Sequence, residues 1–541
     1  MQASPVPRPS LTYPFAAASD LLARVENWRM EATRRLDTDQ RGKLGQFLTP
    51  APVARLMACM FDARPDALHL MDAGAGVGSL SAALVAQALE WESRPHTISI
   101  TAYEVDPMLL GYLRQTLDAC ATACQSSGVR FEYSIEAQDF ITSAVTLLQA
   151  ESLPLLPSTR PRWNGAILNP PYHKINSNST TRQLLRSVGI ETSNLYTAFL
   201  WLALRLLEPG GEMVAITPRS FCNGPYFKPF RTALLQAMAL RRLHVFDSRK
   251  KAFAGDDVLQ ENIILQAIKT TEHQPTVMVS SSAGSDDDLI KMRQVAYASV
   301  VAPNDPDAFI HLVPDEMGEQ VRSRIAHLST SLDTLGLVVS TGRVIDFRAR
   351  PLLRAEPAPD TVPLIYPHNI SQGEIQWPRG NGKKANSLTI PINGDELLVP
   401  AGFYVLVKRF SAKEERRRLV AGVYDPRRIR ADRVAFENHL NYYHQQGEGL
   451  PSELACGLAA FLNSTLVDEY FRQFSGHTQV NATDLRNMKY PTRQQLVTLG
   501  QRFAGGFPAQ DELDDIVAGC LFYPDNNPSR CMLSAVARMA S

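Results

Sequence analysis

The chain has 541 residues, which is more than one ordinary domain holds and predicts two or three. Hydrophobic residues make up 45% and charged residues 20%, as in an ordinary globular protein. The formal net charge is zero, which excludes a bulk attraction to an acidic partner, so a nucleic-acid surface requires local clusters of basic residues. No run of eighteen apolar residues exists, so we expect no membrane span and no membrane partner.

Cysteine usage and the N-terminus indicate a cytoplasmic protein. The first 25 residues lack a basic region, and Asp20 interrupts their apolar stretch, so they do not resemble a signal peptide. The cysteines are odd in number, scattered and without a CxxC pair, which predicts a reduced protein with no disulfide framework and no metal site. They are Cys59, Cys120, Cys124, Cys222, Cys456, Cys520 and Cys531.

The pattern of elements predicts an α/β fold with a doubly wound, mostly parallel seven-stranded sheet. Residues 1–66 form an N-terminal helical segment that contains GQFLTP at 45–50. Over residues 67–270, short apolar runs alternate with helical patterns, as in parallel sheets. We expect strands at 67–72, 97–104, 129–135, 163–168, 212–217, 241–247 and 261–268.

The remainder of the chain changes character. Residues 271–329 begin with a polar stretch rich in Gly, Ser and Asp, which predicts a loop and a connecting segment. Residues 330–495 are rich in Arg, Tyr, Asn and Pro, with short irregular strands, and we expect a mixed α+β second domain there. Residues 496–541 are predicted to be a helical tail.

A glycine-rich loop follows the first predicted strand in the sequence DAGAGVGSLSAAL. Asp72 precedes Gly74, Gly76 and Gly78, and we predict that these four residues bind a cofactor, because such glycines let the backbone turn tightly and approach a ligand closely. This pattern alone is a weak signal, because dinucleotide-binding proteins use nearly the same loop.

Acidic residues follow the next two strands. Glu104 is placed to accept both hydroxyls of a ribose, Asp139 to accept from an exocyclic amine, and Phe140 to pack on an adenine face. Each carboxylate taken singly is equally typical of a helix N-cap. Together they lie at the carboxyl ends of successive strands, where open α/β sheets bind ligands. We therefore predict an adenosine-containing cofactor, either a dinucleotide or S-adenosylmethionine.

The fourth strand ends in Asn169-Pro170-Pro171-Tyr172. The two prolines lack a backbone N–H, so neither a helix nor the hydrogen bonding of an inner strand can continue there. The Asn169 side-chain oxygen and the Pro170 carbonyl can each accept one hydrogen of an adenine amine, which frees its lone pair for attack. Tyr172 offers a ring on which a flipped base can stack. An ordinary proline-rich turn is the alternative, and the position after this strand favours catalysis.

With these motifs in this order, the chain resembles the γ group of adenine-N6 DNA methyltransferases from type II restriction–modification systems. GQFLTP, DAGAGVG, YEVD, QDF and NPPY resemble its motifs in sequence order, and a C-terminal specificity domain follows. The resemblance covers most of residues 40–492 and implies a Rossmann-like fold that binds S-adenosylmethionine. It further implies that Thr49 contacts the methionine part and that Phe253 stacks on the flipped base. A plain core aromatic is the alternative for Phe253.

Basic residues gather in the second domain and suit contacts to DNA phosphates. A solvated helix face is an equally good reading of the run KEERRR. We predict DNA contacts by Lys408, Arg409, Arg416, Arg417, Arg427 and Arg428. Further basic groups comprise Arg343, Arg348, Arg350 and Arg354, and also Arg379, Lys383 and Lys384.

Three other functions are alternatives to methylation of adenine in duplex DNA. An NPPY methyltransferase can act on RNA or on protein glutamine, although such chains usually carry a small recognition module. A catalytically inactive DNA-binding scaffold would not need the intact motifs. A fused enzyme that also cuts DNA would need a nuclease motif, which the sequence lacks. A separate cognate endonuclease is therefore the expected functional partner, and the chain is expected to be a monomer or homodimer.

Overall fold

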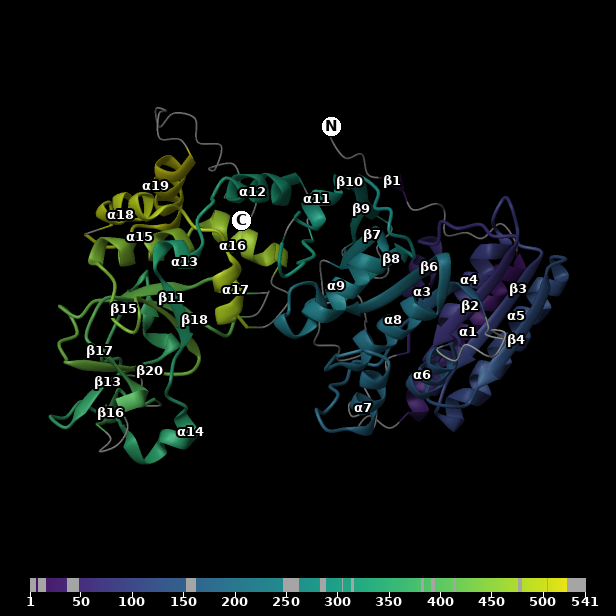
Figure 1. Cartoon of the computed structure of the whole chain (residues 1–541), viewed down its shortest axis with the longest axis horizontal. Helices are drawn as coiled ribbons and strands as arrows, with labels where there is room; N and C mark the ends of the chain where they lie inside the picture. Colours follow the sequence, from purple (N-terminus) through teal and green to yellow (C-terminus); the bar gives the residue numbers. More distant parts are fainter. Residues whose placement is uncertain are drawn as a thin grey trace. The chain divides into compact units, whose positions relative to one another are not determined.

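The computed structural model describes residues 6–7, 16–36, 48–151, 162–246, 262–282, 289–303, 305–312, 316–380, 384–390, 395–411, 415–474, 479–503 and 505–522. The chain forms two compact units, Met1–Asp315 and Glu316–Ser541 (Figure 1). Each unit has its own sheets and its own buried apolar clusters.

The first unit is built on one ten-stranded sheet in the order β1-β10-β9-β7-β8-β6-β5-β2-β3-β4. Pairing is parallel from β4 through β3, β2 and β5 to β6, whereas β8 is antiparallel to both β6 and β7. The strands are β1 (Val6–Pro7), β2 (Ala67–Ala73), β3 (Thr97–Tyr103), β4 (Arg130–Glu136), β5 (Trp163–Leu168), β6 (Leu207–Pro218), β7 (Ala239–Phe246), β8 (Asn262–Ile268), β9 (Thr276–Ser282) and β10 (Leu289–Ala296).

Strands β2 to β8 occupy the seven predicted positions, but the predicted count of seven is wrong. The sheet is mixed and is extended by β9, β10 and the short β1. The loop expected after residue 270 contains strand β9 over Thr276–Ser282, in which Val277 and Val279 are fully buried. The polar Ser280 and Ser282 are buried beside them, and their hydroxyls bond to the two ring nitrogens of His244 at 2.9 and 3.1 Å. Amino-acid composition does not distinguish a loop from a polar strand whose side chains are hydrogen-bonded inside the core.

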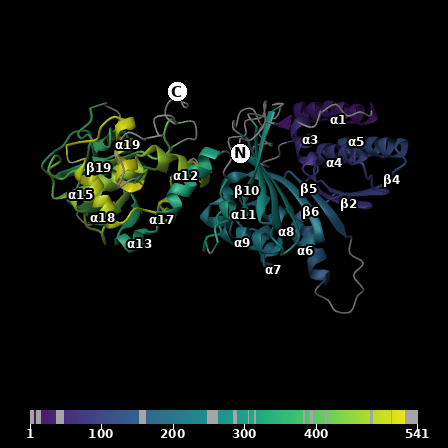
Figure 2. The same ribbon diagram turned by 90° about the horizontal axis from the view of Figure 1, so that it is seen from above.

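Helices cover both faces of this sheet (Figure 2). One face carries α1 (Ala16–Arg35), α3 (Ala51–Cys59), α4 (Ser79–Leu89) and α5 (Pro107–Ser126). The Ala-rich α4 is buried along nearly its whole length because α1, α3 and α5 all pack on it. The other face carries α6 (Phe140–Glu151), α7 (Thr180–Ser187), α8 (Leu195–Leu206), η1 (Arg219–Cys222), η2 (Pro225–Phe227), α9 (Lys228–Ala237) and α11 (Tyr297–Val300).

The central strand β2 lies between β3 and β5, and this order fixes where a ligand can bind. The chain leaves β2 toward α4 on one face of the sheet, and it leaves β5 toward α7 and α8 on the other. Connections that diverge in this way open a crevice at the carboxyl ends of the two strands.

The second unit contains two small sheets of short strands, as its composition predicts. The six-stranded sheet contains β11 (Val338–Thr341), β14 (Ile370–Ser371), β15 (Glu374–Ile375), β18 (Tyr404–Lys408), β19 (Ala421–Tyr424) and β21 (Leu440–His444). The five-stranded sheet contains β12 (Leu353–Arg354), β13 (Thr361–Ile365), β16 (Ser387–Thr389), β17 (Leu398–Pro400) and β20 (Arg433–Phe436).

Helices pack on the six-stranded sheet of the second unit, with α15 and α18 packed closely together. A Cβ on Gly457 of α15 would lie 1.8 Å from the Leu496 carbonyl oxygen, and one on Gly500 of α18 would lie 1.7 Å from that of Glu453. All described helices of the second unit, including those near its five-stranded sheet, are α12 (Glu316–Ala326), α13 (Leu332–Leu335), α14 (Asp346–Ala349), η3 (Arg350–Leu352), η4 (Pro367–Asn369), η5 (Asp395–Leu397), α15 (Ser452–Leu462), α16 (Thr465–Phe474), α17 (Ala482–Asn487), α18 (Arg493–Gln501) and α19 (Gln510–Phe522). In the described ranges, no helix is both long and apolar enough to cross a bilayer.

Candidate active site

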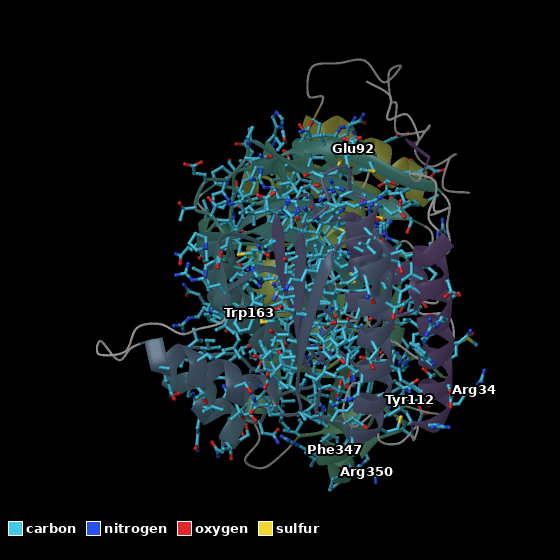
Figure 3. The ribbon with its side chains drawn as sticks, turned by 90° about the vertical axis from the view of Figure 1, so that its right-hand side faces the viewer. Arg34, Glu92, Tyr112, Trp163, Phe347 and Arg350 are labelled. Atoms are coloured by element: carbon cyan, nitrogen blue, oxygen red, sulfur yellow. The ribbon has the colours of Figure 1, made fainter. Side chains whose placement is uncertain are left out.

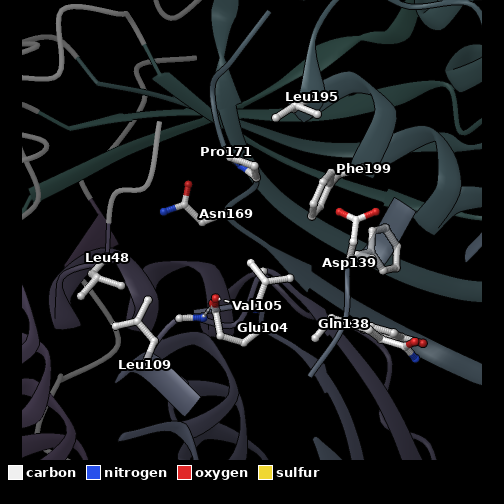
Figure 4. Close-up of a pocket in the computed structure, with 14 residues that line it drawn as sticks. Leu48, Glu104, Val105, Leu109, Gln138, Asp139, Asn169, Pro171, Leu195 and Phe199 are labelled. Atoms are coloured by element: carbon white, nitrogen blue, oxygen red, sulfur yellow. Dashed lines mark hydrogen bonds between the residues drawn. The ribbon is translucent and has the colours of Figure 1, made fainter. Parts of the chain in front are cut away.

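A pocket opens at the carboxyl ends of β2, β3, β4 and β5, on the crevice that the sheet order creates (Figure 4). Its walls combine backbone of the glycine loop, acidic and amide side chains, and apolar rings. The lining residues are Leu48, Gly74, Gly76, Tyr103, Glu104, Val105, Leu109, Gln138, Asp139, Phe140, Asn169, Pro171, Leu195 and Phe199.

The glycine loop adopts backbone conformations that favour glycine. Gly74, Gly76 and Gly78 have φ of +78°, +59° and +84°, in the left-handed region that disfavours other residues. A Cβ on Gly76 would lie 2.9 Å from Leu48 Cδ2, so the loop also packs too closely for a side chain. Gly74 and Gly76 line the pocket, whereas Gly78 caps α4 behind it.

Glu104 holds the glycine loop against the end of β3. Its carboxylate accepts hydrogen bonds from the backbone N–H groups of Gly76 at 2.8 Å, Val105 at 2.8 Å and Asp106 at 2.9 Å. Burial raises the pKa of the Glu104 carboxyl, and these three N–H groups oppose that rise. The carboxylate lines the pocket and has lone pairs for further donors, as the predicted ribose contact requires.

Asp72 lies behind the loop, and the structure does not bring it to the pocket wall. Its side chain is fully buried at the end of β2, where it accepts a 2.6 Å hydrogen bond from Ser81 Oγ. Burial raises the pKa of Asp72 to about 7. Asp72 therefore ties the start of α4 to β2.

Asp139 and Phe140 lie together at the pocket, as predicted, after β4. Asp139 Oδ1 accepts from the Thr142 N–H at 2.8 Å and from Thr142 Oγ1 at 2.9 Å, so this carboxylate caps α6 as well as lining the pocket. The buried ring of Phe140 packs edge-to-face on Tyr103 with a centroid separation of 5.1 Å, and lies 5.0 Å from the ring of Phe199.

The Asn169 amide is oriented from two directions at the end of β5. Its Nδ2 donates to Thr49 Oγ1 at 2.9 Å, and the Tyr172 hydroxyl donates to its Oδ1 at 3.3 Å and to the Ile216 carbonyl at 3.4 Å. Thr49 is 5% exposed, and its bond joins the segment before α3 to the Asn-Pro-Pro-Tyr corner. Asn169 and Pro171 line the pocket, while Pro170 is buried beside them.

The Tyr172 ring is held by Tyr196 of α8 in an edge-to-face arrangement with centroids 6.1 Å apart. The Tyr196 hydroxyl in turn bonds to Ser220 Oγ at 3.0 Å. Burial raises the pKa of the Tyr172 hydroxyl, so it stays protonated at neutral pH. The second predicted stacking residue, Phe253, lies outside the described residues.

Five of the six basic residues predicted to contact DNA already have partners within the second unit. Lys408 pairs with Glu415 at 2.6 Å. The remaining pairs join Arg409 to the Asn438 carbonyl at 3.1 Å, Arg417 to the Ser464 carbonyl at 3.0 Å, Arg427 to Asp425 at 2.8 Å, and Arg428 to Glu374. Arg416 is exposed. These contacts do not exclude DNA binding. However, a phosphate would have to replace an existing partner, which lowers the binding free energy that each phosphate contact adds.

Sequence reasoning missed much of the apolar pocket wall. Phe199 lies within the apolar helix α8, where its pattern matches that of any core residue. Val105 could have been predicted as a pocket residue, because it directly follows Glu104 at a strand end. In the structure this residue is 54% exposed. Gln138 directly precedes Asp139 and could have been included for the same reason.

Comparisons with known proteins place this chain among the methyltransferases of restriction–modification systems. The Eco57I restriction-modification methylase family matches residues 162–253. The type II methyltransferase M.PstI of Providencia stuartii is 44% identical over 493 residues, covering 91% of this chain and 96% of that protein. The type II methyltransferase M.BsuBI of Bacillus subtilis is 43% identical over 463 residues, covering 85% and 90%.

A solved structure shares the fold at low identity. The type IIL restriction-modification enzyme MmeI, determined in complex with DNA, is 10% identical, covers 95% of this chain and 77% of that one, and has a TM-score of 0.52. The matches to M.PstI and M.BsuBI span most of this chain. The chain therefore belongs to the type II methyltransferases of restriction–modification systems.

Proposed function

We propose that this protein transfers a methyl group from S-adenosylmethionine to N6 of adenine in a specific duplex DNA sequence. Family membership makes DNA the substrate and does not favour the RNA and protein alternatives. The observation that carries the proposal is the position of the Asn169 amide, which lines one pocket together with the glycine loop and Glu104.

The pocket residues fit an adenosyl cofactor. Gly74 and Gly76 leave room where a side chain would collide, and Glu104 presents a buried carboxylate to ribose hydroxyls. Phe140 and Phe199 supply apolar contacts for a purine, and Asp139 lies beside them to accept from its amine. S-adenosylmethionine supplies a methyl group activated by an adjacent sulfonium.

Asn169 and Pro170 prepare the amine for attack. The Asn169 Oδ1 and the Pro170 carbonyl accept its two hydrogens, which directs the nitrogen lone pair toward the methyl carbon. A new N–C bond forms as the C–S bond breaks, and the proton is then lost from the amine to water. Neither acceptor titrates, so orientation is the main contribution of these residues. An Asn at the first motif position, in place of Ser or Asp, favours adenine over cytosine.

The target base is held outside the duplex by aromatic contacts. Tyr172 has its ring fixed by Tyr196, which suits a stacking surface, and Phe253 is the second stacking candidate. Residues 330–495 are the proposed recognition domain, and the six basic residues predicted from the sequence are candidates for phosphate contacts. We place the enzyme in the cytoplasm, as a monomer or homodimer that protects DNA from a separate cognate endonuclease.

A substrate panel tests this proposal. Purified protein is incubated with tritiated S-adenosylmethionine and unmethylated genomic DNA, total RNA or protein extract, and the product nucleosides are identified by mass. Label in N6-methyladenine from DNA alone is the expected result. Label in cytosine, in RNA or in protein would overturn the proposal.

A further inference from the structure

A short turn in the second unit presents an apolar ring to solvent beside an arginine. Phe347 of α14 is 68% exposed, and the Arg348 guanidinium lies over its ring with a centroid distance of 5.5 Å. Val344 and Ala349 on either side are buried, so the turn is anchored with its Phe347 side outward. A single exposed phenylalanine does not by itself indicate a contact surface, so the charged residues around Phe347 decide what the turn can bind.

Basic residues from other segments converge on this turn. Asp346 Oδ1 accepts from the Tyr366 hydroxyl at 2.8 Å, and its Oδ2 pairs with Lys384 Nζ at 2.5 Å. Lys384 also lies 5.0 Å from the centroid of the Tyr366 ring. Arg354 of β12 pairs with Ser387 of β16. This pairing places the segment that follows Lys384 next to the strand that follows the turn.

The Tyr366 ring extends this surface to a further arginine. It stacks on His368 with centroids 5.6 Å apart, and Arg379 donates to the His368 carbonyl. Burial lowers the pKa of His368, and the charges of Arg379 and Lys384 lower it further. We name this surface the α14 cluster, defined by Phe347, Arg348, Arg350, Arg354, Arg379 and Lys384.

Among the residues that the structure describes, Asp346 is the acid in contact with the α14 cluster, and Lys384 and Tyr366 already share its carboxylate. Within the part of the chain that the structure describes, the exposed Arg348 and Arg350 have no acidic partner. Figure 3 places Phe347 and Arg350 together at the lower edge of the green ribbon of the second unit. By contrast, Lys408, Arg427 and Arg428 are each paired with a carboxylate.

We propose that the α14 cluster is a DNA-backbone contact of the second unit, with Arg348 and Arg350 on phosphates and Phe347 against a sugar or base edge. This inference rests on the proposed function, because it presupposes a duplex DNA substrate. Two exposed guanidiniums beside one exposed ring suit that partner, since phosphate contacts supply affinity and register while an apolar ring adds contact independent of salt.

Salt dependence of DNA affinity separates these contributions. Removing one phosphate contact reduces the slope of log K against log salt by about 0.9 to 1. The double variant R348A/R350A is therefore expected to bind more weakly, with a slope smaller by about 2. F347A is expected to weaken binding with the slope unchanged. The matched control, K489A/R502A, removes two exposed basic side chains elsewhere in the second unit and should keep the wild-type slope.

The experiment uses the full-length protein and short duplexes containing the methylated site, mapped from wild-type product on genomic DNA. Thermal unfolding confirms that each variant is folded. An R348A/R350A slope equal to wild type, or a larger loss of slope in R427A/R428A, would overturn the inference. F347A with wild-type affinity would overturn the role of the ring. A wild-type protein that labels no DNA would instead overturn the proposed function, so the two failures are distinguishable.

Discussion

Replacing Thr49 by Val removes the acceptor that fixes the Asn169 amide. The two side chains have nearly the same shape, and Thr49 is 5% exposed, so the fold should persist. The substitution abolishes the 2.9 Å hydrogen bond that Asn169 Nδ2 donates to Thr49 Oγ1. The opposing 3.3 Å contact from the Tyr172 hydroxyl lies beyond the usual range for hydroxyl donors and tolerates either amide orientation, because a hydroxyl both donates and accepts.

The expected loss of rate follows from the strength of one such bond. A neutral buried hydrogen bond contributes about 0.5–1.5 kcal/mol, so the single-turnover rate of methyl transfer should fall roughly twofold to tenfold in Thr49→Val. Rapid-quench measurements with saturating cofactor and DNA give this rate without product release. Thr49→Ser keeps the hydroxyl and is expected to stay near the wild-type rate.

The same variant separates two roles for Thr49. The sequence predicts a contact to the methionine part of the cofactor, whereas the geometry assigns Thr49 an orienting role toward Asn169. An orienting role lowers the transfer rate and leaves the cofactor dissociation constant nearly unchanged. A raised dissociation constant for S-adenosylmethionine with an unchanged single-turnover rate would refute the orienting role.

Three other predictions concern single side chains. In Asp72→Asn, the titration of a carboxyl whose folded pKa is about 7 disappears. Because the pKa of Asp72 is higher in the folded than in the unfolded protein, the free energy of unfolding of the wild type falls as pH rises from about 4 through 7. The total decrease is on the order of 4 kcal/mol. The variant should therefore gain unfolding free energy relative to wild type across this window in urea titrations, and a constant difference would contradict the assignment. In Gly457→Ala, the new Cβ meets the Leu496 carbonyl, so we expect a loss of about 1–3 kcal/mol or more in the second unit, whereas Gly519→Ala, which has open space, should be neutral or stabilising. In Glu104→Gln, the loss of a charged acceptor should weaken S-adenosylmethionine binding about tenfold or more by calorimetry, and unchanged affinity would remove Glu104 from the cofactor site.

The sequence predicted the seven strands β2 to β8 because their apolar runs are continuous and bounded by turns. It failed at β9, where Ser280 and Ser282 look like loop residues and their partner His244 lies 36 and 38 residues away. The extent of a sheet depends on such remote contacts, which a local pattern does not contain.

The site was predictable where backbone conformation or chain position determines it. Gly74 and Gly76 occupy left-handed positions that require glycine, and Glu104 follows directly from the end of β3. Asp72 shows the limit of this reasoning: its position beside the loop suggested a cofactor contact, yet its side chain turns to Ser81. Arg428 shows the same limit for charge, since its partner Glu374 is 54 residues distant in sequence.

Methyl transfer by Asn169→Ala, compared with wild type on a duplex containing the mapped site, tests the central claim most directly. The measurement is the single-turnover formation of N6-methyladenine, with affinities for S-adenosylmethionine and DNA determined in parallel. We predict that the variant binds both substrates but forms N6-methyladenine at least about a hundredfold more slowly, because one of two amine acceptors is gone. A variant that methylates adenine at the wild-type rate would contradict the role of the Asn-Pro-Pro-Tyr corner and, with it, the proposed mechanism.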